Sequence, residues 1–336
     1  MSKLTWSEQD AKAVDTARVL AADAVEKVGN GHPGTAISLA PIAYLLYAKV
    51  MNVDPNEPRW LGRDRFVMSA GHSSMTQYAQ LYLNGFGLEL NDIESLRTWG
   101  SLTPGHPEYG HTRFVECTTG PLGAGISNAV GMAMAARREH GIFDPETPVG
   151  ESVFDHFVYT IAGDGCLQEG VSAEASSLAA TQNLGNLFLI YDDNRISIEG
   201  DTKIAFSEDV QARYDAYGWD TYHVDFTNGF TTYEEKVAEL YDVIERAKQI
   251  TDKPHFIKVT TIIGWPLPNK AGDHSVHGSK LGADEISGLK AELGFEDQPF
   301  AIDSELVDWV RANAVERAKE LHAEWDPRYE AWRSAS

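Results

Sequence analysis

Two short polar motifs, each placed directly after an apolar run typical of a strand, constrain the fold of this chain most strongly. Gly163-Asp164-Gly165 follows the run at 157–162, and Asn194 follows the run at 186–191. The segment between them is rich in Ala, Leu, Glu and Ser and is typical of a helix. A strand–helix–strand unit is right-handed and ends both strands at one edge of a parallel sheet. We therefore expect Asp164 and Asn194 to lie close together.

These side chains suit a metal ion that carries phosphate. A carboxylate and an amide oxygen are hard ligands, and Mg²⁺ bound by so few protein groups keeps most of its shell for phosphate and water. Gly165 lets the backbone approach a diphosphate, and the following helix N-terminus favours its charge. Gly-Asp-Gly alone is also ordinary turn chemistry, but the correctly placed Asn194 favours a metal–diphosphate site. Neither a Gly-x-Gly-x-x-Gly fingerprint nor a Walker-type loop is present.

The composition excludes several classes of partner. A net charge of −22 over 336 residues argues against nucleic acid and against anionic membrane surfaces. The two cysteines, Cys117 and Cys166, lack metal-ligand spacing and indicate a reducing compartment. Residues 1–6 contain no apolar signal core, and the apolar stretch at 126–136 is too short to span a bilayer. We expect a soluble, cytoplasmic protein.

Helical and strand patterns alternate along the chain. This alternation predicts an α/β fold with a doubly wound, mainly parallel sheet, helices on both faces and a helical C-terminal segment. A capping-box pattern at Thr232–Glu235 predicts the start of one helix. Residues 333–336 are interpreted as the start of an interdomain linker. The expected helices are 8–28 (capped by Ser7 and ended by Gly29), 37–50, 126–140, one from 232 and 305–324; the expected strands are 65–69, 157–162, 186–191, 220–224 and 255–263.

Two units are predicted. Residues 7–284 would form the diphosphate-binding domain, and residues 285–336 a helical extension with the start of a linker. The helix at 126–140 carries Ala129, Gly131, Ala133 and Ala135 at helical spacing. Such small residues allow close packing, either inside one core or across a dimer axis, and the sequence favours neither.

Six histidines lie in loops rich in glycine or proline. Loops on one edge of a sheet converge in space, so we expect these imidazoles to gather near the phosphate site. Neutral imidazoles suit hydroxyl recognition and proton transfer near pH 7. Zinc is disfavoured because no cysteine or Glu-bearing helix completes a ligand set. The six are His32, His72, His106, His111, His274 and His277.

At this point the motifs resemble a known family. They occur in order and are similar to the N-terminal, thiamine diphosphate-binding domain of transketolases, which act in the pentose phosphate pathway. The resemblance runs from about residue 7 to the end of the chain. The motifs are Gly29-Asn30-Gly31-His32-Pro33-Gly34, Ser69-Ala70-Gly71-His72-Ser73-Ser74, Thr103-Pro104-Gly105-His106-Pro107-Glu108, Thr119-Gly120-Pro121-Leu122-Gly123, Gly163-Asp164-Gly165 with Asn194, and His274-Ser275-Val276-His277-Gly278.

The resemblance implies a role for each matching residue. The side chains of Asp164 and Asn194 and the Ile196 carbonyl would hold Mg²⁺, or Ca²⁺ in its place. His32, His106 and His277 would bind the donor ketose and assist proton transfer. Glu169 and Glu174 resemble carboxylates that link two active sites across a dimer, and an ordinary helix face is the alternative interpretation. The implied contacts of thiamine diphosphate are His72, Gly120, Pro121, Leu122, Gly165, Glu169, Asn194 and His277.

The implied reaction is transfer of a two-carbon ketol unit from a ketose phosphate to an aldose phosphate, in a homodimer. Family members are longer and carry a second domain that binds the aminopyrimidine ring with an activating glutamate. We therefore expect these 336 residues alone to have little or no activity and to need a separate pyrimidine-binding subunit or domain. A split subunit and a truncated fragment fit this length equally.

Several alternatives remain open. Within thiamine enzymes they are dihydroxyacetone synthase, half of a 2-oxo acid dehydrogenase, or a deoxyxylulose phosphate synthase fragment. The histidine motifs favour transketolase over a 2-oxo acid enzyme, since a sugar donor needs those imidazoles. A non-catalytic cofactor-binding protein is the alternative outside enzymes. Arg113, Phe114 and Ala124 depart from the family pattern and affect the expected substrate preference rather than the class.

Overall fold

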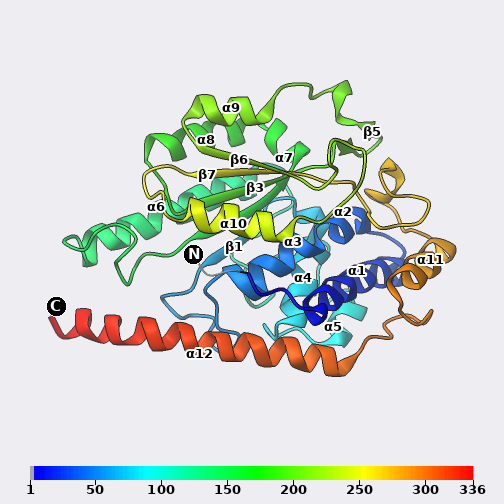
Figure 1. The fold of residues 1–336 in the computed structure, drawn as a ribbon, viewed down its shortest axis with the longest axis horizontal. Helices are drawn as coiled ribbons and strands as arrows, with labels where there is room; N and C mark the ends of the chain where they lie inside the picture. Colours follow the sequence, from blue (N-terminus) through cyan, green and yellow to red (C-terminus); the bar gives the residue numbers. More distant parts are fainter. Residues whose placement is uncertain (1–3, 336) are drawn as a thin grey trace.

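A five-stranded parallel sheet forms the centre of the computed structural model, which describes residues 4–335 (Figure 1). Residues 1–3 of the predicted N-terminal segment, and Ser336 of the predicted linker, lie outside the described residues. The strands lie in the order β1-β2-β3-β7-β6, and each neighbouring pair is parallel. The strands are β1 (Arg65–Met68), β2 (Val158–Gly163), β3 (Leu187–Asp193), β6 (Asp220–Asp225) and β7 (His255–Thr260), with a small antiparallel pair β4 (Ile196–Ser197) and β5 (Gly200–Asp201).

Helices cover both faces of this sheet, which confirms the predicted fold class. On one face α6, α8 and α9 pack on one another and on the strands; α10 covers the other face and contacts α3 (Figure 1). The helices are α1 (Glu8–Val28), α2 (Pro33–Ser38), α3 (Ala40–Leu45), α4 (Ser74–Leu83), α5 (Leu90–Glu94), α6 (Ala124–Phe143), α7 (Asp164–Gln168), α8 (Gly170–Thr181), α9 (Val210–Tyr217), α10 (Val237–Ala247), α11 (Ala283–Leu293) and α12 (Ser304–Ala335).

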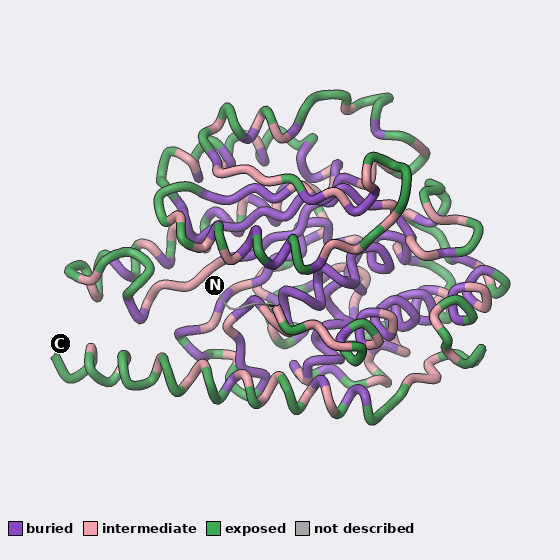
Figure 2. Tube along the Cα trace, viewed as in Figure 1, coloured by how far each residue is buried: buried purple, intermediate pink, exposed green. Residues whose placement is uncertain are grey.

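The core lies on both sides of the central strands. Every residue of β3 is buried, as is every residue of β2 except Gly163 at its end, which explains their continuous apolar runs (Figure 2). The rings of Tyr159 and Phe188 stack across the β2–β3 pair with centroids 5.0 Å apart. The strands expected from the sequence are all present, within one to three residues at their ends.

The first helix forms as its sequence predicts. Ser7 accepts a hydrogen bond from the Asp10 N–H, and the Asp10 carboxylate accepts one from the Ser7 N–H, so a capping box begins α1. Gly29 ends the helix in the left-handed region at φ +80°. The predicted helix at 37–50, by contrast, is divided into α2, α3 and a π-helical turn at Leu46–Val50. The break falls beside Pro41, which has no N–H to continue the helical ladder.

The predicted start of the helix at Thr232 is wrong, because α10 begins at Val237. The two residues expected to form the capping box have other partners. The Thr232 hydroxyl accepts a hydrogen bond from Asn228, and the Glu235 carboxylate forms an ion pair with Arg18 of α1. Tertiary contacts therefore outweigh the local capping signal.

The described end of the chain is helical, since α12 continues past Pro327 to Ala335, and the start of a linker there stays a prediction. The indole of Trp325 donates a hydrogen bond of 3.1 Å to the Val153 carbonyl and meets the Trp60 ring edge-on. The Trp332 indole donates one of 2.8 Å to the Phe143 carbonyl. These contacts hold the second half of α12 against the segment between α6 and β2.

The predicted division at residues 284 and 285 falls inside α11, which packs on α1. It stays a prediction. Among residues 4–335, no helix combines the length and apolar character needed to cross a bilayer.

Truncating Trp325 tests whether α12 is docked. We expect Trp325→Ala to lower the free energy of unfolding by about 2 kcal/mol, because a half-buried indole and its hydrogen bond are lost. Urea denaturation measures the change. Arg333→Ala, on the exposed side of the same helix, serves as the control and should change stability little. Equal stabilities of the two variants would contradict the docking.

Candidate functional site

The carboxyl ends of β2 and β3 bring the two polar motifs to one edge of the sheet. Gly163, the last residue of β2, is in register with Asp192 near the end of β3. Asp164 follows as the first residue of α7, and its side chain is buried. The Tyr191 hydroxyl of β3 donates a hydrogen bond of 2.5 Å to Asp164 Oδ1. The two strand ends therefore lie side by side, as the strand–helix–strand pattern predicts.

Asn194 has a fixed orientation beyond the end of β3. Its Nδ2 donates a hydrogen bond of 2.7 Å to Asp192 Oδ2, and its Oδ1 accepts one of 2.9 Å from the Ile196 N–H. Asp192 is anchored in turn by the Thr261 hydroxyl, which donates a bond of 2.5 Å to Oδ1. An amide oxygen has two lone pairs, so Asn194 Oδ1 retains one for a cation.

The carboxylates at this edge differ in their surroundings: Asp193 forms ion pairs with Lys258 and Arg195, whereas Asp164 and Asp192 are buried beside other carboxylates. Burial, together with the charges of Asp192 and Asp193, raises the pKa of the Asp164 carboxyl to about 7, although the Tyr191 hydrogen bond opposes this shift. Burial likewise raises the pKa of Asp192 to about 6. A divalent cation would reverse this effect, since it favours the ionised carboxylate.

Three of the loop histidines form a compact cluster. His32 is at the start of α2, His72 lies between β1 and α4, and His277 follows a short turn after β7. The ring centroids are 4.9 Å apart for His32 and His72, 5.1 Å for His72 and His277, and 5.5 Å for His32 and His277. The sequence places these residues far apart, and the sheet edge gathers them.

His106 connects this cluster with the metal motif. A Cβ added to Gly120 would lie 3.5 Å from the His106 ring, and a Cβ added to Gly165 would lie 2.9 Å from Leu122 Cδ1. The turn at 120–122 therefore lies between the His106 loop and Gly165, and Leu122 packs so closely on Gly165 that a Cβ there would clash.

The other two loop histidines do not join the cluster. His111 is exposed, and its Nε2 lies 2.7 Å from the Ser101 carbonyl. His274 is exposed beside Asp273. The expectation that all six imidazoles converge is therefore wrong for these two.

The clustered histidines are held in their neutral form. Burial and then the neighbouring His277, Arg97 and His106 lower the pKa of His32 to about 4. Burial and then His32 and His277 lower the pKa of His72 to about 3. Burial lowers the pKa of His106 and His277 as well. Neutral imidazoles both donate and accept hydrogen bonds, which suits hydroxyl recognition.

Unpartnered polar atoms show that this site fits a metal and a polar cofactor. Asp164 Oδ2, His277 Nδ1 and Thr119 Oγ1 are buried, and none has a hydrogen-bond partner among residues 4–335. Buried polar atoms are ordinarily hydrogen-bonded, so these three are available to a ligand. No group of three or more His, Cys, Asp or Glu side chains in the described chain could hold a metal ion. A cation here would therefore depend on Asp164 together with amide and carbonyl oxygens.

Two predicted carboxylates lie at the border of this site. Glu169 occupies the break between α7 and α8, and its side chain is exposed. Its Cβ lies 2.8 Å from the position of a Cβ added to Gly123, at the start of α6. Glu174 is exposed on α8. Their role across a dimer stays a prediction.

Sequence reasoning missed four residues that support the site: Arg97, Tyr191, Asp192 and Thr261. Asp192 carried a local signal, because it stands only two residues before Asn194, whose amide donates to it. Arg97 and Thr261 belong to no motif, and only their side-chain contacts show their positions.

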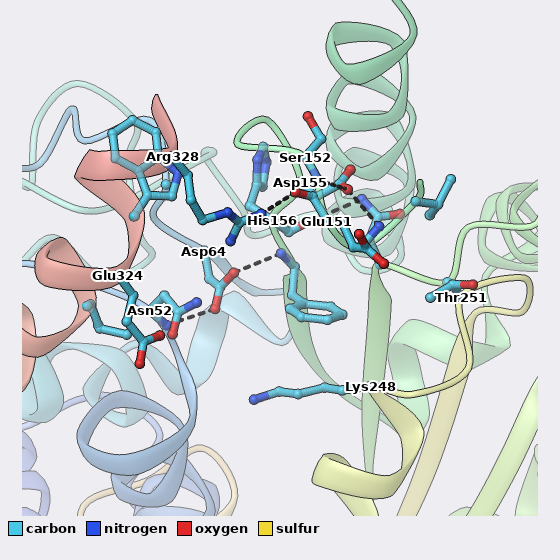
Figure 3. Close-up of a pocket in the computed structure, with 18 of the residues that line it drawn as sticks. Asn52, Asp64, Glu151, Ser152, Asp155, His156, Lys248, Thr251, Glu324 and Arg328 are labelled. Carbon is cyan, nitrogen blue, oxygen red and sulfur yellow. Dashed lines mark hydrogen bonds between the residues drawn. The ribbon is translucent and has the colours of Figure 1, made fainter. Parts of the chain in front are cut away.

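A separate cavity of about 440 Å³ lies at the opposite, amino-terminal edge of the sheet (Figure 3). Asp64, just before β1, accepts hydrogen bonds from the N–H groups of Asn52 and Phe157, while Arg328 reaches the cavity from α12. None of the predicted site residues lines it.

Comparisons with known proteins agree with this geometry. Residues 9–336 match the family model described as "Transketolase, thiamine diphosphate binding domain". A transketolase of Mycobacterium leprae is 57% identical over 328 residues, which are 97% of this chain and 46% of the relative. A chloroplastic transketolase of Zea mays is 48% identical over 95% of this chain and 46% of its own length. The chain thus spans about half the length of the curated relatives that it matches.

Solved structures show the same relationship. A transketolase of Pichia stipitis in complex with sedoheptulose 7-phosphate superposes with a TM-score of 0.89 at 40% identity, over 98% of this chain and 47% of that one. A transketolase of Leishmania mexicana gives a TM-score of 0.89 at 38% identity. The fold and the site define a thiamine diphosphate-binding domain of α/β type. The chain belongs to the transketolase family, and it contains that family's N-terminal thiamine diphosphate-binding domain.

The neutral histidines predict how stability depends on pH. Their pKa values are lowered in the folded state, so unfolding takes up protons below the ordinary value near 6.5. Stability should be unaffected by them above pH 6.5 and should fall as the pH decreases toward 4. The slope of the free energy of unfolding against pH reports the protons taken up on unfolding, and His72→Asn should reduce that number by about one. Urea unfolding at a series of pH values, without cofactor, measures it. His111→Asn is the exposed control, and identical slopes for the two variants would refute the neutral cluster.

Proposed function

We propose that this chain is the diphosphate-binding half of a transketolase, which transfers a two-carbon ketol unit between ketose and aldose phosphates. The observation that carries the proposal is the convergence of a buried carboxylate, an oriented amide and four imidazoles at one sheet edge. Solved relatives from Pichia stipitis carry sedoheptulose 7-phosphate or xylulose 5-phosphate, which supports sugar phosphates as substrates.

In this proposal the metal is held at the ends of β2 and β3. Asp164 Oδ2 and Asn194 Oδ1, each with a free lone pair, would hold it together with the Ile196 carbonyl. Mg²⁺ is the expected ion, with Ca²⁺ as its substitute, because both prefer oxygen ligands. The groups proposed to contact thiamine diphosphate are His72, Gly120, Pro121, Leu122, Gly165, Glu169, Asn194 and His277.

Thiamine diphosphate, when bound, supplies the carbon nucleophile and electron sink for breaking and forming the carbon–carbon bond. His32, His106 and His277 bind the sugar hydroxyls and carry protons to and from the reacting oxygens. Their lowered pKa values keep them neutral near pH 7, so each has one donor and one acceptor for these hydroxyls.

The proposal extends to the assembly and its location. We infer a homodimer in the cytoplasm, with active sites shared between polypeptides. Exposed small residues on α6, such as Gly131 and Ala135, support close packing with a second chain. We further propose that residues 1–336 alone have little activity, because the glutamate that activates the aminopyrimidine ring belongs to a separate domain or subunit.

Reconstitution tests this function. Ketol transfer from xylulose 5-phosphate to ribose 5-phosphate is measured with thiamine diphosphate and Mg²⁺, for the chain alone and mixed with a separately produced pyrimidine-binding half. Activity only in the mixture is the expected result. Robust transfer by the chain alone would show that another residue activates the cofactor, and inactivity of both would count against the transferase assignment.

Removing one proposed metal ligand tests the metal site. Asp164→Asn should weaken Mg²⁺-dependent thiamine diphosphate binding by at least about tenfold, because a neutral amide replaces a carboxylate. In the unsubstituted chain the affinity for Mg²⁺ should fall below pH 7, because protons compete with the metal for Asp164. Calorimetric titration with and without Mg²⁺ measures both effects. Asp201→Asn, at an exposed carboxylate, is the control. Cofactor affinity that ignores Mg²⁺ would exclude this site.

A further inference from the structure

Arg97 lies across the two glycine-rich loops that carry His32 and His106. It follows α5, and its own backbone N–H donates a hydrogen bond of 2.9 Å to the Thr103 carbonyl. This bond closes the turn that leads into the His106 loop. Arg97 has a φ of +59°, an uncommon conformation for a residue with a side chain. Such strained positions persist where the surrounding contacts determine them.

The guanidinium has a contact on each loop. Nη1 donates a hydrogen bond of 3.1 Å to Asn30 Oδ1, while Nη2 lies 3.4 Å from the Gly105 carbonyl oxygen and 3.4 Å from His32 Nδ1. Glycines line its path, since a Cβ added to Gly105 would lie 3.1 Å from Arg97 Cζ, and one added to Gly31 3.6 Å from Nε. The loops are thus shaped around this side chain.

The contact with His32 determines where the imidazole carries its proton. A guanidinium has N–H donors and no acceptor, so His32 Nδ1 must accept and cannot itself be protonated. A neutral His32 therefore carries its proton on Nε2. That edge of the ring lies beside Gly278, since a Cβ added there would be 3.5 Å from both Nε2 and Cδ2. The donor of His32 thus faces the segment that contains His277.

We propose that Arg97 is a positioning residue that joins the His32 and His106 loops and fixes His32 as the neutral tautomer protonated on Nε2. Its importance for ketol transfer rests on the proposed function, whereas the position of the proton does not. Arg97 acts through His32 and His106.

The charge of Arg97 supports the same arrangement. Burial and then the charges of His277, Arg97 and His106 lower the pKa of His32, and His72 lies in edge contact with the same ring. Burial and then Arg97 lower the pKa of His106, although Glu108 opposes this. A fixed cation disfavours a second positive charge nearby, so Arg97 keeps both imidazoles available as neutral partners.

Nitrogen-15 NMR of histidine-labelled protein, without cofactor, tests the proposal directly. The His32 signals are assigned from their loss in His32→Gln. In the unsubstituted chain His32 should show Nε2 protonated and Nδ1 unprotonated at pH 7. In Arg97→Met the two tautomers should mix, and the pKa of His32 should rise by about one unit. Arg97→Lys, which retains a cation, should keep the pKa of His32 close to its original value.

Arg113→Met is the matched control, because Arg113 lies on a neighbouring loop over the Phe114 ring. It removes the same charge and should leave the His32 spectrum unchanged. An Nδ1-protonated His32 in the unsubstituted chain would overturn the proposal, as would an unchanged spectrum in Arg97→Met. If Arg97→Met does not fold, the tautomer of the unsubstituted chain and the Arg97→Lys titration decide the question.

Reconstituted activity separates this proposal from the proposed function. With a pyrimidine-binding half present, Arg97→Met should move the acidic limb of the pH profile of kcat/KM to higher pH, in step with the raised pKa of His32. Absence of activity in the unsubstituted mixture would count against the transferase, while leaving the NMR result for His32 standing.

Discussion

The parallel pairing of β2 with β3 is the constraint on which the site depends. The register that places Gly163 beside Asp192 also places Asp164 and Asn194 just beyond adjacent strand ends. A shift of one residue would turn every side chain of β3 to the other face, and Asp192 could no longer receive the Asn194 amide. Because both strands are almost wholly buried, such a shift would also expose apolar surface, so the core itself enforces the geometry of the polar edge.

The protein as a whole is strongly acidic, whereas the imidazoles clustered in its site are uncharged. The net charge is −22, yet the clustered imidazoles are neutral because burial lowers their pKa values. Screening limits the effect of exposed charges to roughly 8 Å at physiological salt, so the surface and the site act independently. The charged groups nearest the site include the carboxylates at the end of β3, with Lys258 and Arg195 paired to Asp193, and the guanidinium of Arg97.

Much of this arrangement could be predicted from the sequence, since it depends on local patterns. Strand periodicity, the glycines beside Asp164 and the histidines in turns all carry local signals, and the structure gathers His32, His72, His106 and His277 accordingly. The rest depends on contacts between distant segments. The ion pair of Glu235 with Arg18 displaces the start of α10, and the docking of Trp325 accompanies the extension of α12. The residues next to Glu235 and Trp325 in the sequence indicate neither contact. Arg97 could not be predicted for the same reason, because its role depends on the contacts of its guanidinium with residues distant in the sequence.

The place of β7 in the sheet has a consequence for how the chain acquires its native structure. β7 is the last strand among residues 4–335, yet it lies between β3 and β6. Until residues 255–260 are inserted, the hydrogen-bonding edges of β3 and β6 have no partner, and such edges can pair with other chains. Thr261 and His277, which follow this strand, cannot reach the site earlier. During synthesis neither the sheet nor the site can be completed before these residues emerge, and a ribosome-bound chain ending before β7 would be exposed to aggregation.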